Sequence, residues 1–459
     1  MVSGAAHNGG GLDMNEGPAR ALTLLARYGL PAVVGLYYVA ALQALAYSPD
    51  GAYRGYLAAI DLRAGGPPIL AGASTLAPLW VLLLGAADAL GIDLLLGSKI
   101  LSLVFCCFGL LGMYLFASTL IGDRITGLLA TLVAAVDPWL LQAGPSGTST
   151  GLALALSVGS LFFMVRRDFA LGSFFAGLTA AVFWQGGVLM MLIAALITRS
   201  HGFSRASLRR VAGALAVFTS ALVPWVIAAL LQERSPVPEF LSGSEPLVIG
   251  AGRWAIFLSG AAAVVIAIVA PPLRADAAPF PVLSRVPYWG WVLWLLVCAW
   301  LWDVWFLVLA VPPFFALAFD ALAFLSAARA GSATRYLAAI LTITAVLVAA
   351  QQALFLGSTR PAMAASVDRG EEAALAAAWA RGFLRPTQSL EAEPRWQVSY
   401  FLGRSVDPIG RKGAGGADMV ICADSALAGY REAYRPLPGP SPGGGPRLAV
   451  FVKQQDLPQ

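Results

Sequence analysis

Long apolar segments alternate with short polar loops along the chain as far as residue 357. A helix that crosses a bilayer needs about 20 mainly apolar residues, so each long segment predicts a membrane span. We expect eleven spans, at 22–46, 96–119, 125–142, 150–165, 169–184, 186–198, 211–231, 254–271, 288–302, 304–327 and 336–357. The pattern therefore predicts an all-α polytopic membrane bundle over 22–357, preceded by a polar tail at 1–21.

Composition supports this class of protein. The chain is 58% hydrophobic and only 12% charged, whereas a soluble domain carries about 25% charged residues. The stretch up to Pro18 is polar and rich in glycine, which makes a poor signal peptide, so we expect the first span to be retained. Lysine and arginine are scattered over loop ends without a dense patch, which excludes nucleic acid as a partner.

The basic residues predict the orientation of the bundle. Alternate loops hold Arg124, Arg166, Arg167, Arg199, Arg205, Arg209, Arg210, Arg274, Arg285, Arg329 and Arg335. Such loops are usually cytoplasmic, which places the N-terminal tail inside and the acid-rich loops at 48–95 and 232–252 outside. The apolar segment at 74–91 would reverse every later loop if it crossed the membrane. We interpret it as a helix at the outer interface.

Histidine bears on metal binding. His7 and His201 both fall on the expected cytoplasmic side, which excludes a His-ligated zinc site on the outer face.

The composition changes after residue 357. Residues 358–459 contain charges and clusters of proline and glycine, and no segment long enough to span a membrane. The pattern predicts a helix at 371–383 and two short buried strands at 417–423 and 447–453. We expect a small α/β domain on the same outer side as the first loop.

The stretch directly after the first expected span contains acids, which are rare in this chain. On a helix over 50–63, Asp50, Arg54 and Asp61 fall within a narrow arc, because steps of four and seven residues nearly coincide. The other face carries an apolar stripe of Tyr53, Tyr56 and Ile60. The helix could then lie on the outer surface with its acids directed at a cavity between spans.

Two interpretations of the acids remain open from the residues alone. The order Ser48, Pro49, Asp50 is a good helix start, so Asp50 either serves the helix terminus or has a functional role. Asp61 either pairs with a neighbouring arginine on a solvated face or belongs to a site, and the surface pair is the commoner arrangement.

The order of features resembles the GT-C superfamily of glycosyltransferases that use polyprenyl-phosphate sugars. The matching features are an acid directly after the first span (Asp50), the sequence Pro78-Leu79-Trp80, a cation at the start of the next span (Lys99), and Pro138 opening the second outer loop. The likeness runs from Leu22 to Lys453. It is closest to the bacterial branch related to protein O-mannosyltransferases and the lipid A aminoarabinose transferase, of family-39 type.

The resemblance implies a function and a site. In that family the acid after the first span is the catalytic carboxylate, so Asp50 would be the general base of an inverting sugar transfer. The donor would be a polyprenyl-phosphate sugar, and the acceptor a glycan, lipid or protein outside the cytoplasmic membrane of a bacterium. Two departures, Gly51 and the stretch 148–150, stand where relatives often carry further acids. A catalytically degenerate membrane scaffold is therefore the alternative, and a transporter a weaker one.

Cations would neutralise the leaving lipid phosphate. The substrate-binding candidates are Arg54, Asp61, Lys99 and Arg253. For Lys99 and Arg253 the alternative is that the long side chain simply reaches for the membrane interface. A divalent cation, Mg²⁺ or Mn²⁺, would need oxygen ligands. The outer acids available are Asp50, Asp61, Glu233, Glu239 and Glu245, and we assign none of them as a ligand.

Overall fold

The computed structural model of the chain describes most of the expected bundle and much of the C-terminal part after residue 357, which we call the outer domain after the side of the membrane expected for it. The described residues are 16–42, 49–64, 78–202, 204–231, 285–301, 306–329, 333–385, 388–392, 394–403, 406–409, 417–423, 430–435 and 448–453. Some helical residues in these ranges, among them Asp50 and Asp61, are described by their backbone alone.

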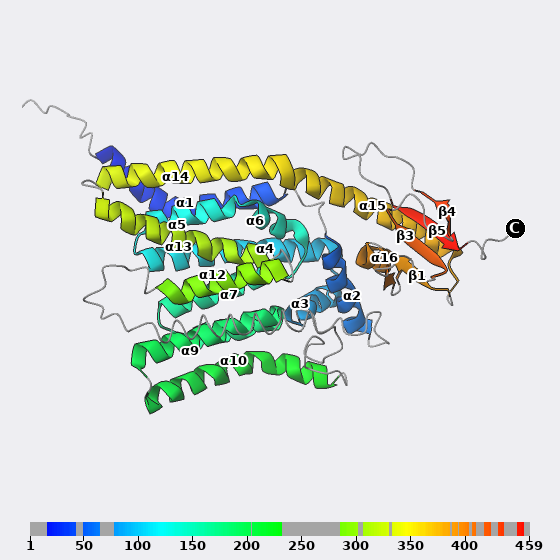
Figure 1. Cartoon of the computed structure of the whole chain (residues 1–459), viewed down its shortest axis with the longest axis horizontal. Coiled ribbons are helices and arrows are strands. Elements are labelled where there is room, and N and C mark those ends of the chain that lie inside the picture. The colour runs from blue at the N-terminus through cyan, green and yellow to red at the C-terminus, as the bar shows by residue number, and fades with distance from the viewer. Residues whose placement is uncertain are drawn as a thin grey trace, which may run out of the picture.

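The membrane part is a bundle of helices that lie side by side (Figure 1). The helices are α1 (Glu16–Leu42), α4 (Leu94–Ile121), α5 (Arg124–Ala135), α6 (Pro138–Ala143), α7 (Thr150–Val165), α8 (Phe169–Val182), α9 (Val188–His201), α10 (Arg205–Leu231), α12 (Val286–Leu301), α13 (Phe306–Arg329) and α14 (Ala333–Leu354). Among the described residues, four helices are long and apolar enough to cross a membrane, or five if α5 and α6 count as one bent span.

Most of the expected spans coincide with these helices, and the span expected at 254–271 lies outside the described residues. The count of eleven stays a prediction, because several of the helices are shorter than a full span.

The segment expected as one span at 125–142 is broken. Helix α5 ends at Ala135, α6 begins at Pro138, and their axes are bent by 60°. Pro138 has no N–H to continue the helical ladder. Asp137 instead starts a new helix, because its carboxylate accepts the N–H of Trp139 at 2.9 Å. The segment expected to form the second outer loop therefore begins among buried residues of the bundle.

The basic loops gather at one end of the bundle, which we call the basic end. The ends of α4, α7, α9 and α13 lie there, as do the starts of α5, α8, α10 and α14 (Figure 1). Arg285, at the start of α12, joins the same end, since it donates to the carbonyl of Leu120 at the end of α4 and pairs with Asp320 of α13 at 2.9 Å. This is the alternation that the basic residues predict, and the side of the membrane that this end faces stays a prediction.

Helix α14 continues into the outer domain without a loop. A π-helical turn at Phe355–Thr359 joins it to α15 (Arg360–Phe383). The helix expected at 371–383 is present but begins earlier, at Arg360. The expected domain boundary at 357/358 falls within the π-helical turn, and the division into domains stays an interpretation.

The outer domain is a five-stranded sheet covered on one face by helices. Its elements are β1 (Leu390–Ala392), α16 (Arg395–Leu402), β2 (Asp407–Pro408), β3 (Met419–Cys422), β4 (Tyr430–Tyr434) and β5 (Ala449–Lys453), with strand order β2-β1-β3-β5-β4. β1 runs parallel to β2 and β3, and α16 makes the crossover that parallel pairing needs. β5 is antiparallel to β3 and β4. The two strands expected at 417–423 and 447–453 are confirmed as β3 and β5.

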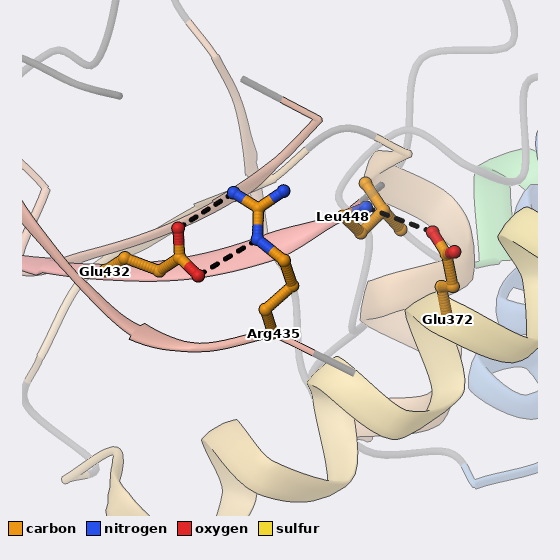
Figure 2. A network of polar contacts seen from close by, with 4 residues as sticks. All are labelled: Glu372, Glu432, Arg435 and Leu448. Carbon is orange, nitrogen blue, oxygen red and sulfur yellow. Dashed lines mark hydrogen bonds and ion pairs between the residues drawn. The ribbon is translucent and has the colours of Figure 1, made fainter. Parts of the chain in front are cut away.

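Helix α15 is fixed to the sheet by apolar packing and by one carboxylate. Alanines of α15 pack on buried side chains of β3 and β5, among them Ile421 and Val450. Glu372 of α15 accepts the N–H of Leu448, just before β5, at 3.0 Å (Figure 2). Figure 2 also shows Glu432 and Arg435 of the β4 edge paired through two contacts of 2.9 and 2.8 Å.

The ion pairs Arg285–Asp320 and Arg435–Glu432 are expected to differ in their contribution to stability. Arg285–Asp320 is only 24% and 14% exposed, and Asp320→Asn should lower the free energy of unfolding by about 2 kcal/mol, because a largely buried guanidinium loses its partner. Glu432→Gln is the matched control, since that pair is exposed and should contribute less than about 1 kcal/mol. Thermal unfolding in detergent measures both. Equal shifts would contradict the expectation.

Candidate active site

The segment expected to form the first outer loop places two helices across the end of the bundle opposite the basic end, which we call the site end. Helix α2 (Asp50–Ala64) crosses the ends of the spans, and α3 (Pro78–Ala89) lies beside it (Figure 1). The helix expected over 50–63 is confirmed, and the one expected at 74–91 is present as α3 from Pro78 to Ala89. Gly91, with φ of 75°, follows α3. Their position at a membrane interface stays a prediction.

Asp50 is the first residue of α2. The turn begins with Pro49, whose carbonyl accepts the N–H of Ala52 at 3.0 Å. Arg54 is half-buried on the same helix, and its Nε is fully buried. The side chains of Asp50 and Asp61, and the whole of Arg253, lie outside the described residues. The predicted arc of charged groups on α2 therefore stays a prediction.

Lys99 lies one helical turn into α4 and is only 5% exposed. Its neighbour Ser98 donates a hydrogen bond to the hydroxyl of Tyr56 on α2, at 2.8 Å. Tyr56 is fully buried. The contact joins the start of α4 to the helix that begins with Asp50. The predicted base and the predicted cation are thus carried by two helices in direct contact.

A glycine turn completes this junction. Gly147 follows a short 3-10 turn at Gly144–Ser146 and has φ of 70°, a conformation that side chains rarely adopt. A Cβ on Gly147 would meet the Tyr56 hydroxyl, would stand 2.8 Å from the Ser98 Oγ, and would stand 3.5 Å from the Lys99 Cγ. Helix α2, helix α4 and the Gly147 turn therefore meet beside the stem of Lys99, with no space for a side chain at position 147.

Replacing Gly147 by alanine is expected to lower the unfolding temperature more than replacing Gly122. Both glycines have positive φ, so an alanine at either position carries about 1 kcal/mol of backbone strain in the folded state. Nothing lies within 4 Å of a Cβ on Gly122, whereas on Gly147 it collides with two hydroxyl groups. Thermal unfolding of Gly147→Ala against Gly122→Ala separates steric conflict from backbone strain. Equal losses would show that the junction is loose.

Hydroxyl groups occupy the place where relatives of the resembled family carry an acid. Ser146 and Thr148 lie 2.7 Å apart through their hydroxyl oxygens, and Thr148 donates to the hydroxyl of Thr150 at 3.0 Å. Thr148 and Thr150 are half-buried. Next to Lys99, this series can donate hydrogen bonds to phosphate or sugar oxygens, but it cannot take up a proton as a carboxylate does.

The outer domain also contributes to the site end. Tyr400 and Phe401 of α16 pack against Tyr53 and Tyr56 of α2, with ring centroids 5.3 to 5.8 Å apart. Burial raises the pKa of Tyr400, and the carboxylates of the α3–α4 region raise it further, so this phenol stays neutral at physiological pH. The residues alone did not reveal this contact. The only sequence signal was an aromatic pair in an otherwise polar tail.

Asp137 is a buried acid that the sequence alone did not indicate. Asp137, at the α5–α6 break, is 7% exposed and accepts a hydrogen bond from Gln351 of α14 at 3.1 Å. The signal that could have found it is the dipeptide Asp-Pro directly after an apolar run, since this pair starts a helix where a span should continue.

The described residues contain no group of three His, Cys, Asp or Glu side chains that could hold a metal ion. The acids available for a divalent cation are Asp50, Asp61, Glu233, Glu239 and Glu245, and all their side chains lie outside that part of the chain. A metal requirement stays a hypothesis.

The fold and the site end define a class of protein: a polytopic membrane protein with a broken span, helices across one end and an α/β domain above them. Comparison with solved structures is consistent with this class. ArnT from Cupriavidus metallidurans bound to undecaprenyl phosphate is similar over 93% of this chain and 99% of that one, with a TM-score of 0.52 and 14% identity. Its apo state matches over 96% and 100%, with a TM-score of 0.50 and 14% identity. The chain therefore shares its overall fold with ArnT. The sequence matches no protein-family model and no curated protein.

Proposed function

We propose that the protein is a membrane glycosyltransferase that moves a sugar from a polyprenyl-phosphate donor to a glycan, lipid or protein acceptor outside the cytoplasmic membrane of a bacterium. The observation that carries the proposal is Lys99, a cation almost fully buried at the site end of a fold shared with a protein crystallised with undecaprenyl phosphate. A lysine ammonium at this end of the bundle can bind a lipid phosphate through charge-assisted hydrogen bonds.

The proposed reaction is a single displacement. The carboxylate of Asp50 takes the proton of an acceptor hydroxyl, whose oxygen attacks the anomeric carbon of the sugar. The bond from that carbon to the phosphate oxygen breaks, and its electron pair leaves with the lipid phosphate. Lys99 and Arg54 neutralise the phosphate charge as it forms, with Arg253 and Asp61 as further substrate contacts. One displacement inverts the anomeric centre.

The test measures transfer directly. Membranes that contain the wild-type chain are given undecaprenyl-phosphate-linked sugars, and mass spectrometry follows new glycan products and released undecaprenyl phosphate. Membranes without the chain are the control. We expect new glycan products and released undecaprenyl phosphate only where the chain is present. Identical glycans in both membranes would contradict the enzyme and favour the degenerate scaffold, while movement of intact donor across the membrane would favour a transporter.

A further inference from the structure

The segment 138–146, which leads to the Gly147 turn, is held on several sides. Tyr37 of α1 donates to the carbonyl of Leu140 at 2.9 Å, and Ser102 of α4 donates to the carbonyl of Ala143 at 3.1 Å. A helix of six residues leaves most of its carbonyls without partners inside the helix. Neighbouring helices therefore supply the missing partners, and these contacts decide where the turn lies.

Asp137 begins this segment and differs from the other capping aspartates. Asp93, Asp123 and Asp168 also accept backbone N–H groups at helix starts, but their side chains are at least partly exposed. Asp137 is the buried carboxylate among the acidic side chains that the structure describes. It also has a donor from far along the chain, the Nε2 of Gln351. Capping accounts for the contact with Trp139, and it does not account for Gln351.

Gln351 contains a buried polar atom that lowers the stability of the fold. It is 8% exposed, and within the described part of the chain its Oε1 is buried without a hydrogen-bond partner. A buried polar atom without a partner is destabilising, so an apolar residue would suit this place in α14 better. Gln351 precedes the π-helical turn at 355–359, and that turn packs against α6. Such turns are frequent at functional sites.

We propose that Asp137 and Gln351 are positioning residues for donor binding. Their hydrogen bond fixes the segment 138–146 to α14, and the segment holds the Gly147 turn against Lys99 and Tyr56. The helix that carries the outer domain is thereby connected to the phosphate end of the site. This inference rests on the proposed function, since it assigns the contact to the binding of the lipid phosphate.

Donor binding is expected to depend on the hydrogen bond between Asp137 and Gln351 and not on the charge of Asp137. In Asp137→Asn the asparagine still caps α6, because asparagine and aspartate cap helices about equally well. Its amide can donate to the Oε1 of Gln351 after the glutamine amide turns over. Asp137→Asn should therefore keep the affinity for undecaprenyl phosphate within about threefold.

The full-length chain in detergent tests this with two readouts, the dissociation constant for undecaprenyl phosphate and the KM and kcat of sugar transfer. Asp137→Ala and Gln351→Leu should each weaken undecaprenyl phosphate binding and raise the donor KM by about tenfold or more, with a smaller change in kcat. The double variant should bind undecaprenyl phosphate no more weakly than Asp137→Ala does, because both substitutions remove the same hydrogen bond.

Each other result overturns the inference. If Asp137→Asn is as damaging as Asp137→Ala and lowers kcat alone, the carboxylate takes part in the chemistry. If the variants only lower the unfolding temperature and keep the wild-type dissociation constant, the contact is structural. If the wild type binds and transfers normally but Gln351→Leu does too, this inference fails while the proposed function stands. A wild type that neither binds nor transfers overturns both.

Discussion

Asp50→Asn is expected to lower the rate of sugar transfer about 10²–10⁴-fold, the range that a positioned general base contributes. The amide has the size of the carboxylate and can still serve a helix start, but it cannot take the proton of the acceptor hydroxyl. Donor binding should change little, since the phosphate contacts lie on other residues. Single-turnover transfer with purified protein measures the chemical step.

Asp61→Asn is the matched control for this substitution. It makes the same chemical change on the same helix, about three turns from Asp50. We expect a modest rise in donor KM, in keeping with a substrate contact, and nearly unchanged transfer at saturating donor. An Asp50→Asn protein as active as wild type would remove the proposed base and leave Asp50 as a helix-start residue.

Lys99→Met is expected to weaken the binding of undecaprenyl phosphate roughly 30-fold or more, since a buried charge pair that loses one partner costs about 2–5 kcal/mol. Methionine retains most of the stem that packs beside Gly147, so the junction should stay folded. The measurement is a titration of detergent-solubilised protein with undecaprenyl phosphate at two ionic strengths. Little salt dependence is expected, because buried pairs are poorly screened.

Lys453→Met is the matched control for the lysine. It removes the same charge from the last residue of β5 in the outer domain, away from the site end. We expect wild-type affinity. If Lys99→Met binds as tightly as this control, Lys99 only reaches for the membrane interface, and the proposal loses the observation that carries it.

The sequence pattern predicted the features that hydrophobicity and charge determine. Most of the helices of the bundle, the two helices at 50–64 and 78–89, and the alternation of basic loops follow from apolar length and from where arginine lies. β3 and β5 were predictable because both are short apolar runs. β1 and β2 were not, since strands of three and two residues carry no period. β4 is an edge strand of largely exposed polar residues, so it lacks the expected alternation.

The candidate site was predictable only where local sequence determines it. Asp50 and Lys99 could be selected because each stands at a fixed place next to a span. The contacts of Tyr56 with Ser98, of Tyr400 with Tyr53, and of Gln351 with Asp137 join residues that are distant along the chain. A single sequence contains no signal for such pairs, because tertiary packing alone brings them together.

The uninterrupted path from α14 through the π-helical turn into α15 sets the rotational phase of the outer domain. One residue of an α-helix corresponds to about 100° of rotation about the helix axis. A single insertion or deletion between Leu354 and Arg360 would swing the outer domain around the bundle and carry Tyr400 away from α2. Insertions or deletions here are tolerable only when they add or remove close to a whole number of helical turns. The length of this short stretch therefore determines the angle at which the outer domain sits on the bundle.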